Sequence, residues 1–226
     1  ELEDAVRLLL KQRVRLVPAG RTDSGVHGLN QVCQFDAVLG ELHAEQIADI
    51  LSPRLPEDLL VLNTSAVPSS VNVMITRWKR YVYRIPTFGA KGGSLQDFCT
   101  SVTQAAAGDI ELLKVDDMLT AASLLLGTHD FAAFQTKNGR QSTVRTLHRC
   151  DVREASDRSI AIVMEADGFL MHMCRILAGT LLQVGCGLHV PHRVVEVLES
   201  LDRKEAGPTL PAGGLCLEHV EHLRDW

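Results

Sequence analysis

Long apolar stretches are missing from this sequence of 226 residues. A membrane-spanning helix needs about 18 to 20 consecutive apolar residues, and the leucine runs at 8–10 and 124–126 are much shorter. No charged leader followed by an apolar segment opens the sequence, so no signal peptide is expected. We therefore predict a protein that does not associate with a membrane.

Closely spaced cysteines are missing too. The six cysteines stand at positions 33, 99, 150, 174, 186 and 216, and no two form a Cys-x-x-Cys pair. This spacing argues against a zinc site made of thiolates. A chain of this length does not depend on disulfides, so we expect reduced thiols inside the cell, with the cytoplasm and an organelle both open.

An excess of positive charge is also missing, because the formal net charge is −5 and the isoelectric point is about 6.0. Binding to nucleic acid would have to rest on local clusters of cations. With 46% apolar and 23% charged residues, the composition is that of a globular protein and excludes a disordered chain. The length allows one large domain or two small ones.

Periodic apolar residues are present along most of the chain. Their spacing predicts helices at 1–13, 43–51, 115–126, 170–184 and 192–201. Alternation predicts strands at 14–17, 31–35, 59–62, 74–85, 144–152, 159–164 and 213–220. A loop is expected at 86–94 and a short helix or strand at 95–102.

These elements mix helices with runs of strands, and 144–152 with 159–164 forms a hairpin pattern. We therefore predict an α+β fold in which helices pack on a largely antiparallel sheet. The least structured segment lies near 67–70, and we place a domain boundary there, between residues 1–69 and 70–226.

Asp23 is the first candidate for chemistry. It follows a predicted strand and lies in a loop with three glycines, two residues after Arg21. Loops at the end of a sheet often present functional side chains. The alternative is structural, because Asp before Ser-Gly is common in turns.

Residues 77–84 form a second candidate, with four cations interleaved with three aromatic residues. Cations neutralise phosphates and aromatic rings stack on unpaired bases, which favours RNA binding. The alternative is an edge strand protected by its charges.

Arg175 is the third candidate, because it is a lone charge in an apolar helix. If it is buried, it needs a carboxylate partner from elsewhere in the chain. The alternative places it on the exposed side of the helix.

His129 and Asp130 are the fourth candidate and could belong to a metal-dependent phosphohydrolase. No further His and Asp ligands at suitable spacing stand out. We favour a structural role, in which Gly127 ends a helix and His129-Asp130 turns the chain.

The candidates occur together in an order that resembles one family. Ala-Gly-Arg-Thr-Asp-Ser-Gly-Val-His-Gly (19–28) is similar to the Gly-Arg-Thr-Asp-x-Gly-Val-His-Ala/Gly signature of tRNA pseudouridine synthases of the TruA type. Residues 80–83 resemble the family's Arg-Tyr-x-Tyr strand, and residues 168–175 resemble its Gly-Phe-x-x-x-Met-x-Arg helix. Residues 127–131, 144–146 and 211–217 match further blocks, so the resemblance covers nearly the whole chain.

The resemblance implies two ferredoxin-like halves that form an extended, mostly antiparallel sheet, with helices on one side and a central catalytic cleft. It implies conversion of uridine to pseudouridine in tRNA, without a cofactor or a metal. By the same resemblance the catalytic residues are Asp23, Arg175 and Tyr81. The residues implied in binding RNA are Arg21, Thr22, His27, Lys79, Arg80 and Phe169.

Within these roles, Asp23 attacks C1′ or removes a sugar proton, and both mechanisms stay open. The target base has to be extruded from the RNA. Arg21 helps to take the place of that base, and Tyr81 packs on the flipped uracil. An arginine beside a carboxylate favours its charged form, which gives Arg175 a reason to lie in an apolar helix.

The sequence also departs from the family. The opening strand and the aromatic-Gly-Trp-Gln segment do not precede residue 1, so we expect the first strand of the N-terminal sheet to be missing. Asn72-Val73 replaces an Ala-Arg pair, so the RNA contact of that arginine is expected to be lost or moved to Arg77. The main alternative function is a non-catalytic RNA-binding paralogue of the same fold. A homodimer stays open, because bacterial members are dimers and several eukaryotic relatives are not.

Overall fold

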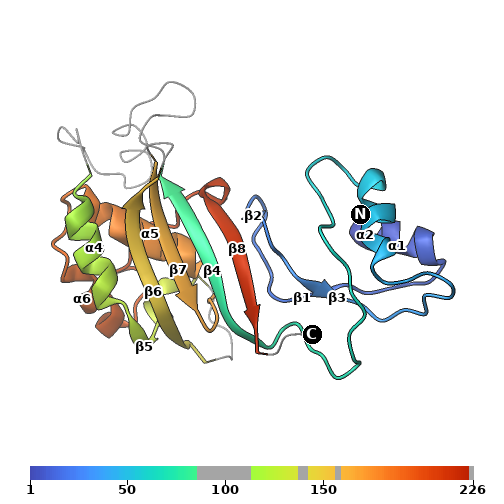
Figure 1. Cartoon of the computed structure of the whole chain (residues 1–226). Helices are drawn as coiled ribbons and strands as arrows, with labels where there is room; N and C mark the ends of the chain where they lie inside the picture. The colour runs from blue at the N-terminus through green and yellow to red at the C-terminus, as the bar shows by residue number, and fades with distance from the viewer. Residues whose placement is uncertain (86–112, 137–141, 156–158, 224–226) are drawn as a thin grey trace. The chain divides into compact units, whose positions relative to one another are not determined.

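The computed structural model describes residues 1–85, 113–136, 142–155 and 159–223 (Figure 1). The loop expected at 86–94 and the element expected at 95–102 lie outside these residues. Two compact units are present: unit 1 comprises residues 1–21, 32–75 and 222–226, and unit 2 comprises residues 22–31 and 76–221. The single boundary expected after residue 69 stays a prediction.

Unit 2 is built on a six-stranded sheet. Its order is β2 (His27–Gly28), β8 (Leu215–His222), β4 (Thr76–Ile85), β7 (Ile160–Ala166), β6 (Val144–Glu154) and β5 (Gly127–Asp130). β4 with β7, β7 with β6, and β6 with β5 pair antiparallel, whereas the short β2 runs parallel to β8. The predicted mixture of helices with an open, mostly antiparallel sheet is confirmed.

The central strand β4 shows how the alternating pattern forms the sheet. Val82 packs against Ala161 and Val163 of β7, and Val82 and Val163 are register partners. Tyr83 is 1% exposed, and its hydroxyl donates a hydrogen bond to the carbonyl of Pro211 at 3.0 Å. The reading of residues 77–84 as a protected edge strand is wrong, because β8 and β7 flank β4 on both sides.

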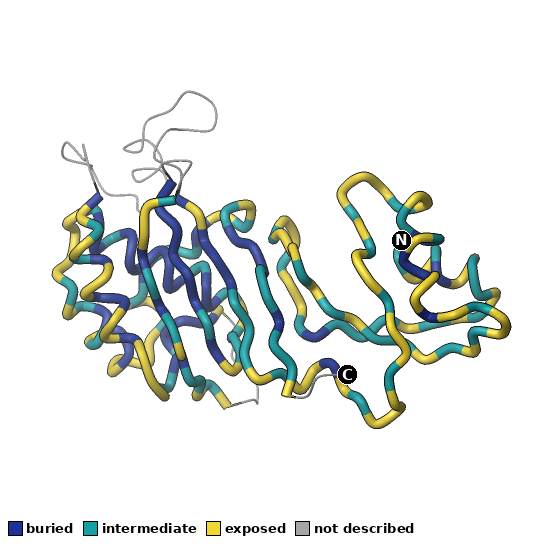
Figure 2. The backbone as a smooth tube through the Cα atoms, viewed as in Figure 1, coloured by how far each residue is buried: buried dark blue, intermediate teal, exposed yellow. Residues whose placement is uncertain are grey.

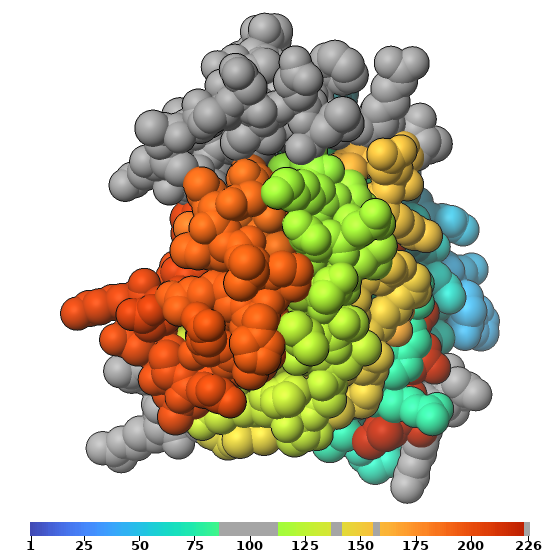
Figure 3. All heavy atoms as spheres, turned by 90° about the vertical axis from the view of Figure 1, so that its left-hand side faces the viewer, coloured from blue at the N-terminus to red at the C-terminus, as the bar shows by residue number. Residues whose placement is uncertain are grey.

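Among the described residues of unit 2, three helices form the layer that packs on this sheet: α4 (Val115–Leu124), α5 (Met173–Gly185) and α6 (Arg193–Ser200). α4 packs on β6 and α5 on β4, while α4, α5 and α6 contact one another. Figure 3 looks onto this side of the molecule, where α4 and α6 form neighbouring parts of the surface. Most residues of α5 are buried, so it is the inner helix of the layer (Figure 2).

Unit 1 has a small core of its own. Val6 of α1 (Leu2–Leu10) packs with Ile47 and Leu51 of α2 (Gln46–Leu51), and partly buried apolar residues surround them. The 3₁₀ helix η1 (Ser52–Arg54) follows α2 directly. β1 (Val17–Pro18) and β3 (Cys33–Gln34) form a two-stranded antiparallel sheet.

Several boundaries expected in unit 1 are wrong. The helix expected at 1–13 ends at Leu10, because Lys11 adopts a left-handed conformation with φ 54°. The strand expected at 59–62 does not form, and Leu60 and Leu62 are 64% and 67% exposed. Without a neighbouring strand and a buried face, apolar alternation does not make a strand.

Within the described ranges, none of the helices is long and apolar enough to cross a bilayer.

Candidate active site

The loop that carries Asp23 is fixed to the edge of the six-stranded sheet. The backbone N–H of Val26 donates to the carbonyl of Asp23 at 3.1 Å and closes a turn, in which Gly25 has φ +83°. This φ favours glycine, because a Cβ is strained there. β2 then pairs with β8, so the turn is held in place at the end of this parallel pair.

Arg175 of α5 binds the carboxylate of Asp23 within unit 2. Its Nη1 donates to Oδ2 of Asp23 at 2.9 Å, and its Nε donates to the carbonyl of Leu210 at 2.6 Å. The side chain of Arg175 is 15% exposed and that of Asp23 is 28% exposed. The sequence-based expectation that Arg175 needs a carboxylate partner is therefore confirmed, and its placement on an exposed helix face is wrong.

His172 contacts the same carboxylate oxygen and was missed by the sequence analysis. Its Nε2 lies 3.4 Å from Oδ2 of Asp23, and its Nδ1 lies 2.8 Å from Oγ1 of Thr136. The residue directly precedes α5, three positions before Arg175. It occupies a variable position of the Gly-Phe-x-x-x-Met-x-Arg pattern, so only the presence of a histidine at the start of that helix could have drawn attention to it.

Tyr81 and Phe169 provide an apolar surface close to these groups. Tyr81 is 7% exposed, and its ring meets that of Phe169 edge to face, with centroids 5.2 Å apart. Burial raises the pKa of the Tyr81 phenol well above its ordinary value, and the nearby Cys174 thiol and Asp23 carboxylate raise it further. Tyr81 therefore keeps its proton and is not suited to act as a general base.

Two cations of β4, Arg80 and Arg84, have carboxylate partners. Nε of Arg80 donates to Oε1 of Glu165 at 2.7 Å, and its guanidinium carbon lies 5.3 Å from the centre of the Trp78 ring. Arg84 pairs with Glu218 at 3.2 Å. Partial burial lowers the pKa of Lys79. The positive charge of Arg80 is therefore offset by Glu165, and the contacts of Lys79 and Arg80 with RNA stay predictions.

Of the remaining predicted residues, Arg21 and Thr22 lie in the loop and His27 is the first residue of β2. Arg21, Thr22 and His27 are exposed. Thr22 and His27 belong to unit 2 with Asp23, whereas Arg21 is the last residue of its segment in unit 1. Their roles in binding RNA stay predictions.

His129 and Asp130 have local structural contacts. Nε2 of His129 lies 2.8 Å from the carbonyl oxygen of Leu126, and Oδ1 of Asp130 accepts the backbone N–H of Ala132 at 3.0 Å. Both residues lie in β5, so the expectation that they turn the chain is wrong, although Asp130 does cap the turn that follows. Among the residues that the structure describes, no group of three or more His, Cys, Asp or Glu side chains is arranged to hold a metal ion.

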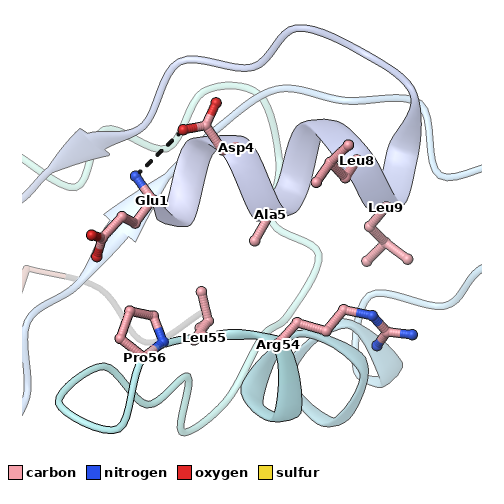
Figure 4. A pocket seen from close by; sticks show the side chains of 8 residues that line it. All are labelled: Glu1, Asp4, Ala5, Leu8, Leu9, Arg54, Leu55 and Pro56. Carbon is pink, nitrogen blue, oxygen red and sulfur yellow. Dashed lines mark ion pairs between the residues drawn. The ribbon is translucent and has the colours of Figure 1, made fainter.

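A pocket of unit 1 lies between α1 and the segment after α2 (Figure 4). It is lined by Glu1, Asp4, Ala5, Leu8, Leu9, Arg54, Leu55 and Pro56. Its carboxylates come from Glu1, which directly precedes α1, and from Asp4 in the first turn of α1. None of the predicted site residues lines this pocket.

The geometry around Asp23 determines what its carboxylate can do. The contacts that Arg175 and His172 make with the Asp23 carboxylate both go to Oδ2. A partly exposed carboxylate that is held through one oxygen can use the other as a nucleophile or as a base. The buried Tyr81 ring and the partly buried Phe169 ring provide a surface for a flat, apolar group next to it.

Comparison with known proteins identifies one family. A family model described as tRNA pseudouridine synthase matches residues 121–222. The tRNA pseudouridine synthase A of Thermoanaerobacter sp. (strain X514) is 35% identical over 218 residues, which cover 96% of this chain and 86% of that protein. The tRNA pseudouridine synthase A of Shouchella clausii is 36% identical over 98% of this chain and 83% of its own length. That of Pelobacter propionicus is 38% identical over 98% of this chain and 88% of its own length. With this identity over nearly its whole length, the chain belongs to the tRNA pseudouridine synthase family.

Proposed function

We propose that this protein is an isomerase that converts uridine to pseudouridine in tRNA, with Asp23 as the nucleophile or base. The observation that carries the proposal is the Asp23–Arg175 ion pair, formed between the family signature loop and the family signature helix. The relatives named tRNA pseudouridine synthase A support tRNA as the substrate.

The reaction is balanced without an external reagent. The N1–C1′ bond of uridine breaks, the uracil ring turns, and a C5–C1′ bond forms. N1 gains a proton and C5 loses one, so the product is an isomer of the substrate. Asp23 supplies the anionic oxygen, which either bonds to C1′ for a time or takes a sugar proton.

The other site residues have roles that suit their surroundings. Arg175 orients the carboxylate, because its Nε is fixed to the Leu210 carbonyl while its Nη1 binds Asp23. The Tyr81 ring, supported by Phe169, packs on the extruded uracil. Arg21 fills the space that the base leaves in the RNA. These roles are proposals drawn from the geometry and from the family resemblance.

RNA binding is proposed for the exposed loop residues and for β4. Thr22 directly precedes Asp23 in the loop, and His27 begins the short strand β2 that follows the loop. Lys79 and Arg80 precede Tyr81 in β4. Contacts between such residues and phosphates are electrostatic, so binding to tRNA should weaken as salt rises. Because tRNA is found inside cells, we place the protein there. Whether the protein lies in the cytoplasm or in an organelle stays a prediction. Whether it forms a homodimer also stays a prediction.

A purified protein and an unmodified tRNA transcript test the proposal. Uridine in the transcript carries tritium at C5, which pseudouridine formation releases to water. Release of tritium, together with pseudouridine found by chemical labelling of the product, is the expected result. A protein that binds tRNA in a salt-dependent way but releases no tritium from any tRNA would favour the non-catalytic RNA-binding alternative.

A further inference from the structure

His172 has an unusual backbone conformation for its position. Its φ is 63° and its ψ is 6°, in the left-handed region. Two other non-glycine residues of the described chain have positive φ, Lys11 and Leu201, and both end helices. A left-handed residue is common after a helix, whereas His172 stands in front of one. For a residue other than glycine this conformation is strained.

This conformation places the imidazole of His172 in contact with two side chains, those of Thr136 and Asp23. Oγ1 of Thr136 lies 2.8 Å from Nδ1, and Oδ2 of Asp23 lies 3.4 Å from Nε2. The side chain of His172 is 23% exposed, so protein surrounds most of the ring. Strained residues persist where the surrounding structure fixes them, and they concentrate at functional sites.

Hydrogen-bond chemistry selects one arrangement of protons. If the hydroxyl of Thr136 donates to Nδ1, a neutral imidazole carries its proton on Nε2 and presents an N–H to Asp23. The opposite tautomer would turn a lone pair toward the carboxylate and repel it. The contact at 3.4 Å is long for a hydrogen bond, and such bonds often tighten when the substrate arrives.

We propose that His172 is a positioning residue for Asp23. Together with Arg175 it holds Oδ2, so that Oδ1 is the oxygen that faces C1′ or the sugar proton. The carboxylate of Asp23, which only accepts hydrogen bonds, selects the tautomer, and the contact with Thr136 fixes the direction of the ring. This inference rests on the proposed function of Asp23, and it adds a role that neither the signature loop nor the signature helix assigns.

His172→Asn is the most informative variant. Asparagine tolerates the left-handed region, and its side chain reaches about as far as Nδ1, so the contact with Thr136 is kept. The asparagine side chain is too short to reach Asp23. We expect kcat for pseudouridine formation to fall about 10- to 100-fold, because small misplacements of a reacting group have effects of this size. KM for tRNA should stay within about twofold, since no contact with RNA is removed.

Two further variants separate positioning from a structural role. His172→Gln places an N–H near the position of Nε2 and should restore part of kcat. Leu201→Asn is the matched control, because it also places an asparagine at a left-handed position, here at the end of α6. It should leave kcat unchanged. A kcat of His172→Asn equal to that of the wild type overturns the proposal, and so does a failure of His172→Gln to exceed His172→Asn.

A spectroscopic measurement keeps the test independent of activity. The imidazole nitrogens of His172 are followed by NMR in the wild type, in Thr136→Val and in Asp23→Asn. We expect a proton on Nε2 in the wild type and a shift of the Nε2 signal in Asp23→Asn. An unchanged signal would contradict the contact. If the wild-type protein makes no pseudouridine while the signals shift as expected, the proposed function fails and the positioning contact stands.

Discussion

Oδ2 of Asp23 and Nη1 of Arg175 lie 2.9 Å apart, although 152 positions separate the two residues in the sequence. The pair joins the loop at one edge of the sheet to the inner helix α5. Burying the arginine alone would be costly, so the carboxylate and the carbonyl of Leu210 together explain a charge in an apolar helix. The same pair orients the group that we propose to carry the chemistry.

Arg175→Ala should therefore reduce both stability and activity. We expect the free energy of unfolding to fall by about 2–4 kcal/mol, below the range for a fully buried pair because both side chains are partly exposed. Tritium release should become undetectable. Arg175→Lys keeps the charge but cannot bind Leu210 and Asp23 in the same fork, so it should recover stability more than activity. Urea denaturation and the tritium assay measure the two effects.

The control for this series is Arg193→Ala. Arg193 of α6 pairs with Glu196 and Glu205, which are about half exposed, so the loss of stability should be about 1 kcal/mol or less. Activity should equal that of the wild type. Equal losses in Arg175→Ala and Arg193→Ala would show that the Asp23 pair has no special role.

Tyr81→Phe should lower kcat by less than about tenfold. The ring that packs against Phe169 remains in this variant. Because the pKa of the phenol is raised, the hydroxyl stays protonated and does not act as a base, so its removal takes no base from the site. Tyr81→Ala should cost far more, because it removes the whole surface on which the base is proposed to stack. Comparison of kcat and KM for the two variants checks this order. Equal effects would assign the role to the hydroxyl.

Gly214 and Gly213 provide a matched pair for the packing behind Tyr83. A Cβ at Gly214 would lie 2.6 Å from Cζ of Tyr83 and 2.8 Å from its hydroxyl oxygen. Tyr83 is buried and its hydroxyl is bonded to Pro211, so the ring cannot move away freely. Gly214→Ala should cost about 1–3 kcal/mol, whereas Gly213→Ala, with no atom within 4 Å of its Cβ, should stay within about 0.5 kcal/mol. Thermal unfolding of both variants tests this, and similar values would contradict the packing.

Stability should fall at alkaline pH. Burial raises the pKa of the Cys150 thiol from 9.0 to about 12, and it raises the pKa of Tyr83 above 10.0. The folded protein therefore keeps these protons at a pH where the unfolded chain releases them. This stability is complete below about pH 9 and is lost as pH rises toward the pKa of the folded state. Urea denaturation between about pH 8 and pH 11 should show the loss, and Cys150→Ala should make it less steep. A stability that does not change over this range would contradict the raised values.

Much of this site could be predicted from the sequence, because local patterns indicate its residues. A lone arginine in an apolar helix requires a partner, and a glycine-rich loop after a strand presents its aspartate. His172 could not be found in this way. Its role depends on a left-handed conformation and on a contact with Thr136, which is 36 positions away. The interior position of β4 was also missed, because it depends on β8, which lies more than a hundred residues downstream.

Unit 1 shows the limit of periodicity. Leu60 and Leu62 alternate as in a strand, yet both are exposed and form no strand, because no neighbouring strand pairs with them. Val17–Pro18 and Cys33–Gln34 form only a two-residue ladder where longer strands were expected. Pairing between distant segments decides whether such residues form strands, and this pairing cannot be derived from local periodicity.

The most direct test of the central claim is pseudouridine formation by Asp23→Asn. Asparagine keeps the size of the side chain but has no anionic oxygen to attack C1′ or to take a proton. We expect tritium release from C5-labelled tRNA to be abolished, while binding of tRNA at fixed salt stays equal or becomes slightly tighter, because a negative charge has been removed. Turnover of Asp23→Asn at the rate of the wild-type protein would contradict the assignment of Asp23 as the catalytic residue.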